Sequence, residues 1–174
     1  PLVSMMTDEL LVGRYHRHLD NLVELARREV DRTKKWQPQF HDLAWFYLHE
    51  FSDVRRIFRE VYGSNLVSAF RKHRDAGKLE IITCGATHGF LPLMQEHPES
   101  IRAQIMIARD HYRQCFGCDP RGIWLPECAY AEGVETVLQE ANIRWFITDT
   151  HGILHARPRP RYGVFAPIYT PNGI

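Results

Sequence analysis

Titratable side chains follow three short apolar runs of this chain, at the points where each run ends. His88 comes after LEIIT, Glu127 comes directly after GIWLP, and Asp149 and His151 come after RWFIT. Carboxylates and imidazoles are the groups that most often transfer protons, attack substrates or bind metals in active sites. Their placement therefore indicates a catalytic or ligand-binding site assembled from several strand ends.

Each of these residues also has a purely structural interpretation. Glu127 could cap the helix expected near Ala131, Asp149 could support an Asx turn, and His88 could be a buried histidine bonded to a backbone carbonyl. For any one of these residues alone, the structural interpretation explains its position at least as well as a functional role does. Their shared position at strand ends favours a common functional site, because perturbed titratable groups gather at such sites.

The elements that would hold these residues alternate along the second half of the chain. We expect strands at 79–83, 122–126 and 144–148, separated by a helix that starts at Pro98 and ends at Gly117 and by a second helix through 134–141. This order is typical of a parallel α/β sheet, either open or closed into a barrel. Such folds place their sites in the loops that leave the carboxyl ends of the strands.

The first half of the chain is expected to be helical. Apolar residues recur at helical spacing over residues 15–30 and again over 43–61, after the break at KWQPQF, and a shorter helix is expected over 64–75 with Ser64 or Asn65 as its N-cap. We therefore divide the chain into a helical segment, residues 1–78, and a β/α portion, residues 79–174, of one domain.

Composition excludes several classes of partner. The chain has 174 residues, 44% of them hydrophobic and 25% charged, with a net charge of +1 from 22 basic and 21 acidic side chains. This balance is typical of a globular protein. It creates no broad electrostatic field that would attract nucleic acid or an anionic membrane surface, so we expect a neutral substrate. No run approaches a membrane span and no signal peptide is recognised, so we expect a cytoplasmic protein.

The four cysteines include one C-x-x-C pair, Cys115 and Cys118. A structural zinc site would need a second pair or well-spaced histidines. We therefore expect reduced cysteines in a cytosolic protein, without a metal or another cofactor.

Three motifs resemble those of glycoside hydrolase family 57, namely LEIITCGATHGFLPLM, GIWLPECAY and FITDTHGIL. The resemblance covers most of the chain and is greatest to the 1,4-α-glucan branching enzymes, which act on glycogen or amylose in glycogen biosynthesis. It implies an incomplete (β/α)7 barrel, a retaining mechanism without a metal, and an α-glucan substrate. It also implies that Glu127 is the catalytic nucleophile and that His88 is a substrate-site residue.

Two features of the family are missing between Pro1 and Ile174. The resemblance implies a histidine-rich motif on the first barrel strand and an acid/base aspartate downstream of the TDTHG segment. We therefore expect this chain to be a fragment of a longer enzyme whose acid/base lies elsewhere, with Asp149 as a structural or substrate-orienting carboxylate.

Aromatic residues near the expected site have two possible roles. Tyr130 and Phe90 flank it and could stack on a glucose ring, although packing is as common a role for such residues. Alternation along GIWLPE places Ile123 and Leu125 on the face of Glu127, which predicts that Trp124 points into the helix layer as a core residue.

Other functions stay open at this point. An α-amylase or a 4-α-glucanotransferase of the same family would use the same nucleophile. His88, Asp149 and His151 could instead bind a divalent metal in a carbohydrate deacetylase. A non-catalytic glucan-binding protein is the third alternative. The sequence carries no indication of the oligomeric state, or of whether water or a sugar hydroxyl completes the reaction.

Overall fold

The computed structural model describes residues 2–174, which form two compact units, residues 2–76 and residues 77–174. Each unit buries its own set of apolar side chains. No helix among residues 2–174 is both long enough and apolar enough to cross a membrane. Whether the two units belong to one catalytic domain stays a prediction.

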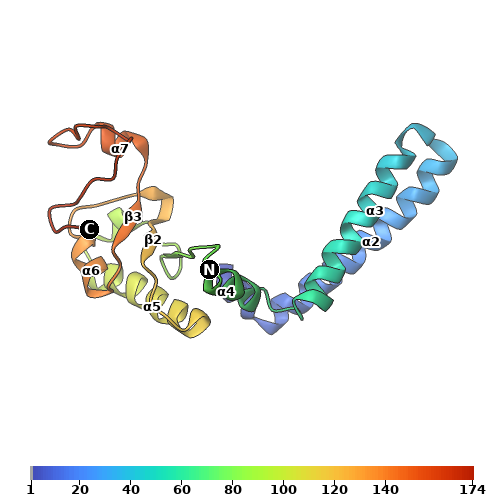
Figure 1. Ribbon diagram of the computed structural model, residues 1–174, viewed down its shortest axis with the longest axis horizontal. Coiled ribbons are helices and arrows are strands. Elements are labelled where there is room, and N and C mark those ends of the chain that lie inside the picture. Colours follow the sequence, from blue (N-terminus) through green and yellow to red (C-terminus); the bar gives the residue numbers. More distant parts are fainter. Residues whose placement is uncertain (1) are drawn as a thin grey trace. The chain divides into compact units, whose positions relative to one another are not determined.

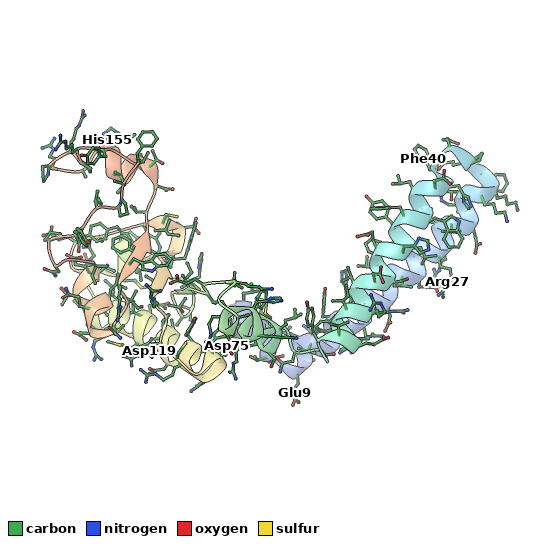
Figure 2. The ribbon with its side chains drawn as sticks, viewed as in Figure 1. Glu9, Arg27, Phe40, Asp75, Asp119 and His155 are labelled. Atoms are coloured by element: carbon green, nitrogen blue, oxygen red, sulfur yellow. The ribbon has the colours of Figure 1, made fainter. Side chains whose placement is uncertain are left out.

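The unit of residues 2–76 is entirely helical. Its elements are α1 (Leu2–Thr7), α2 (Glu9–Trp36), the 3₁₀ helix η1 (Pro38–Phe40), α3 (His41–Arg56), the π-helical turn η2 (Ile57–Val61) and α4 (Leu66–Asp75). Helices α2 and α3 lie side by side (Figure 1), and Phe40 lies at the tip of their hairpin (Figure 2). The helices expected in this half of the chain are confirmed.

Local signals explain where these helices begin and end. The Asp8 side chain accepts the Leu11 N–H at 2.9 Å and so caps α2, and the Asn65 side chain accepts the Ser68 N–H at 3.0 Å and so caps α4. Pro38 follows the end of α2, because proline cannot continue a helix without losing a hydrogen bond. Of the two N-caps considered for the third helix, Asn65 is therefore the one used.

The unit of residues 77–174 contains the sheet. Its elements are β1 (Thr83–Cys84), η3 (Leu91–Met94), α5 (Pro98–Phe116), β2 (Gly122–Trp124), η4 (Pro126–Cys128), α6 (Val134–Glu140), β3 (Trp145–Ile147) and α7 (Thr150–Leu154). The strands pair in the order β1-β2-β3, and both pairings are parallel. Figure 1 shows β2 and β3 with α5 and α6 beside them. The expected alternation of strands and helices is confirmed.

Helix α5 has the bounds that its sequence predicts. Pro98 occupies the first turn, where its missing N–H costs nothing. Gly117 ends the helix with a φ of +75°, and its N–H bonds the Arg113 carbonyl at 2.8 Å. The side chains of Ile101 and Ile105 are buried along one stripe of the helix.

The first strand is shorter than expected, because only Thr83 and Cys84 pair with β2. The register places Thr83 opposite Ile123, so an extension of the ladder would place Glu80 opposite Pro120. Proline has no N–H to donate, which excludes Glu80 from the ladder, whereas Ile81 and Ile82 would face Arg121 and Gly122 and still do not pair. The strand expected over 79–83 is wrong in its bounds, since β1 begins at Thr83 and ends at Cys84.

Trp124 lies on the opposite face of the sheet from the one predicted. Ile123 and Leu125 are fully buried in a cluster with Ile105 of α5 and Leu138 of α6, so their face is the one that the helices cover. Trp124 alternates with them and is 41% exposed. The prediction of a core tryptophan is wrong, because it assumed that Glu127 continues the alternation of the strand.

Candidate active site

The ends of β1 and β2 bring two of the candidate residues into contact. His88 Nε2 lies 3.3 Å from Glu127 Oε1, and both side chains are accessible to solvent, with 44% and 72% of their surfaces exposed. With its proton on Nε2, the imidazole donates a hydrogen bond to the carboxylate. The second carboxylate oxygen then stays available for another partner.

The backbone of this site has an uncommon conformation. Glu127, Cys128 and His88 have φ values of +56°, +53° and +60°, in the left-handed region that residues other than glycine rarely adopt. Each such residue costs of order 1 kcal/mol, and such strain gathers at functional sites. The turn at Glu127 also redirects its side chain away from the buried face of Leu125.

The structural interpretations of Glu127 and His88 are wrong. Glu127 lies in the 3₁₀ turn Pro126–Cys128 and caps no helix, since α6 begins only at Val134 with Gly133 at its N-cap. His88 is exposed and its ring contacts a carboxylate, so it is not a buried histidine bonded to a carbonyl.

The loop that carries His88 is fixed by Gln104 of α5. The Gln104 side chain accepts the Thr87 N–H at 2.9 Å and donates to Thr87 Oγ1 at 2.6 Å. The backbone carbonyl of Gln104 accepts the Ala86 N–H at 3.0 Å. Sequence reasoning missed this residue. The available signal was its position three residues after the buried Ile101, where a polar side chain needs a partner.

Gly85 permits the close approach of the two loops. A Cβ at this position would lie 3.1 Å from Pro126 Cγ and 3.3 Å from Gln104 Oε1, closer than most side-chain contacts. Pro126 directly precedes Glu127, so the missing side chain lets the His88 loop pack against the Glu127 turn.

The end of β3 joins the same site through Thr148 and Asp149. Thr148 Oγ1 donates to the Cys128 carbonyl at 3.0 Å. Burial raises the pKa of the Cys128 thiol, and the negative charges of Asp149 and Glu127 raise it further. The two carboxylates therefore both lie within electrostatic reach of one thiol.

Asp149 precedes α7, but its side chain makes no capping hydrogen bond to that helix. His151 lies within α7 and is exposed. No group of three His, Cys, Asp or Glu side chains within residues 2–174 is arranged to hold a metal ion. His88, Asp149 and His151 therefore do not form a three-ligand cluster in this part of the chain.

The two aromatic candidates differ in their surroundings. Tyr130 stacks on Phe146 of β3, with ring centroids 5.4 Å apart and planes inclined by 12°, and its hydroxyl donates to Glu135 at 2.9 Å. Phe90 precedes η3 and is 40% exposed. The structure thus fixes Tyr130 in place and leaves Phe90 at the surface.

Solved structures of an α-amylase and of a branching enzyme match this chain. The α-amylase AmyC from Thermotoga maritima superposes with a TM-score of 0.94 at 44% identity, over 100% of this chain and 33% of that one. A GH57-type branching enzyme from Pyrococcus horikoshii superposes with a TM-score of 0.87 at 28% identity, over 98% of this chain and 34% of that one. The chain spans about a third of the length of each.

A curated relative supports the same relationship. A 1,4-α-glucan branching enzyme from Thermococcus kodakarensis is 30% identical over 165 residues, which cover 86% of this chain and 23% of that protein. The three parallel strands and their helices are part of an incomplete (β/α)7 barrel, preceded by a helical segment. The model of glycosyl hydrolase family 57 matches residues 8–174. The resemblance of the motifs is thereby confirmed, and the chain belongs to glycosyl hydrolase family 57.

Proposed function

We propose that this chain contributes the nucleophile, Glu127, to a retaining enzyme that acts on α-glucans, most specifically a 1,4-α-glucan branching enzyme. The contact between His88 and Glu127 at the ends of neighbouring strands is the observation that carries this proposal. An exposed carboxylate that is oriented by one hydrogen bond and has a second oxygen available is suited to attack an electrophile.

The reaction is a double displacement. One Glu127 oxygen attacks the anomeric carbon, the glycosidic bond breaks, and the leaving oxygen takes a proton from an acid. The 6-hydroxyl of an acceptor glucose then attacks the glucosyl-enzyme and gives its proton to the group that served as the acid, which is now in its basic form. This step forms an α-1,6 bond and returns Glu127 to its ionised form.

His88 has a positioning role in this scheme. Its ring holds Oε1 of Glu127, so the carboxylate does not need to be oriented when substrate binds. Asp149 lies within reach of the same turn and contributes a carboxylate that orients substrate hydroxyls.

Hydrolysis is the second candidate activity, since the α-amylase AmyC is 44% identical to this chain over its whole length. The two activities differ only in the acceptor, which is water or a sugar hydroxyl. Incubation with amylose separates them: branching increases α-1,6 linkages with few new reducing ends, whereas hydrolysis increases reducing ends alone.

Replacement of the proposed nucleophile tests the function. Glu127→Gln in the complete protein should lower kcat by at least about 1000-fold while amylose still binds, because the charge is lost and the shape is retained. The matched control is Glu132→Gln, an exposed glutamate of the same loop, which should keep parental activity. Activity of Glu127→Gln within a few fold of the parent would exclude it as the nucleophile.

A further inference from the structure

Glu135 stands out because its charged side chain is almost completely buried. Only 3% of its surface is exposed, and within residues 2–174 it is the single charged residue of the buried set. A buried carboxylate is costly unless hydrogen bonds replace its hydration. Its partners therefore indicate what the residue does.

Both recorded partners bind the same carboxylate oxygen. Glu135 Oε2 accepts the Tyr130 hydroxyl at 2.9 Å and the Gly133 N–H at 2.9 Å. Gly133 is the N-cap of α6, so the glutamate reaches back to the start of its own helix, much as in a capping box. The carboxylate thus ties the loop after Glu127 to α6.

The ring of Tyr130 is held at two points. Its hydroxyl is bound by Glu135, and one face lies parallel to the Phe146 ring of β3. The residue is still 37% exposed, so part of the ring is accessible. A ring held in this way loses little conformational freedom when it contacts a ligand.

We propose that Glu135 is a positioning residue that holds Tyr130 as a rigid aromatic surface, three residues after Glu127, against which a sugar ring of the substrate packs. The proposal rests on the proposed α-glucan activity for its substrate. Tyr130 then contributes binding, and Glu135 acts only through Tyr130 and the loop.

The ionisation of Tyr130 is consistent with this role. Burial and the hydrogen bond to Glu135 raise the pKa of Tyr130 to about 12. The hydroxyl therefore stays a hydrogen-bond donor throughout the neutral pH range.

Variants of the complete protein test the proposal through KM and kcat on amylose. Glu135→Ala should raise KM about 10-fold, the equivalent of one lost contact, with kcat within about 3-fold of the parent. Glu135→Gln retains an oxygen that can accept both hydrogen bonds, so its KM and kcat should each stay within about 2-fold of the parent values. Tyr130→Leu, which removes the ring, should raise KM as much as Glu135→Ala does.

The double variant and amide exchange separate positioning from general stability. Because both residues act through one ring, Tyr130→Leu combined with Glu135→Ala should raise KM no more than either change alone. Additive effects, or an unchanged KM in Tyr130→Leu, would overturn the proposal, and the second result stays available if Glu135→Ala does not fold.

Amide hydrogen exchange over residues 128–134 needs no substrate. It should be faster in Glu135→Ala and parental in Glu135→Gln, and equal exchange in all three proteins would overturn the positioning role. Failure of the proposed function would give a different result. The parent protein would then bind no α-glucan, while exchange would still be faster in Glu135→Ala and parental in Glu135→Gln.

Discussion

The His88 ring and the Glu127 carboxylate lie 39 residues apart in the sequence and meet only because their strands are neighbours. A hydrogen bond to a charged group contributes about 1.5–3 kcal/mol where it is shielded, and less where water competes. Both side chains are largely exposed, so this contact falls below that range, at about 0.2–1 kcal/mol.

His88→Ala should therefore lower kcat by about 2- to 5-fold, because the carboxylate loses its orienting partner. The matched control is His97→Ala. The His97 ring lies 3.7 Å from Glu99 Oε1, both side chains are exposed, and His97 makes no capping hydrogen bond to α5. Steady-state rates on amylose check the prediction, and equal rates for both variants would contradict the role of His88.

The Cys128 thiol reports on the two carboxylates of the site. Burial is the largest cause that raises the pKa of this thiol, and the charges of Asp149 and Glu127 raise it further. Alkylation of Cys128 should therefore require a higher pH than alkylation of an ordinary cysteine. Removing either charge stabilises the thiolate and lowers the pKa. At a fixed pH below that pKa, Asp149→Asn and Glu127→Gln should each alkylate faster than the parent.

Iodoacetamide labelling followed by peptide mass analysis measures the rate at Cys128, and labelling of the exposed Cys118 serves as the internal control. A pH profile of Cys128 that neither substitution shifts would show that the carboxylates lie outside the electrostatic reach of the thiol. This test concerns only the geometry of the site and is independent of the reaction that the enzyme catalyses.

Among the elements, α5 is the one that most directly supports the site. It packs on the sheet through Ile105 and holds the His88 loop through Gln104. Gln104→Ala removes two side-chain hydrogen bonds to Thr87, so exchange of the amides of residues 85–88 should increase and kcat should fall by no more than it does in His88→Ala. Gln114→Ala, an exposed change on the same helix, is the control. Unchanged exchange in Gln104→Ala would show that the loop is held by other contacts.

Much of this architecture follows from local sequence signals. Pro98 and Gly117 delimit α5, Asn65 caps α4, and the parallel order follows from the alternation of strands and helices. The extent of the first strand does not follow from its own residues, because LEIIT is rich in β-forming side chains and yet only Thr83 of this run pairs with β2.

The position of the site could be predicted from the sequence, but the residues that hold its loops in place could not. Glu127 and His88 were found because strand ends in a parallel sheet meet at one edge. Of their supporting residues, Glu135 lies on a helix where a single polar side chain carries no distinctive pattern, and the one signal for Gln104 was its position after the buried Ile101. The face of Trp124 was missed because a left-handed residue at position 127 interrupts the alternation, and alternation alone does not reveal such a turn.

The complete enzyme needs a second carboxyl group that acts as the acid. A retaining enzyme needs a second carboxyl group about 5–5.5 Å from the nucleophile, and neighbouring strands are only about 4.8 Å apart. Asp149, at the end of the strand beside β2, is therefore geometrically suited to be paired with Glu127. An acid must also hold its proton near neutral pH, which requires burial or a nearby negative charge.

Asp149 is exposed in this part of the chain, and the resemblance of the motifs implies an acid downstream of the TDTHG segment. We predict that it orients substrate, that the acid lies outside residues 1–174, and that these residues alone do not cleave or transfer glucan. The test uses Asp149→Ala in the complete protein with amylose and with an α-glucosyl fluoride, whose leaving group needs little protonation. An orienting residue is needed for both substrates, so activity should fall by a similar factor on each. If the variant were inactive on amylose but turned over the fluoride at the parental rate, Asp149 would be the acid, since only the step that needs a proton would have been lost.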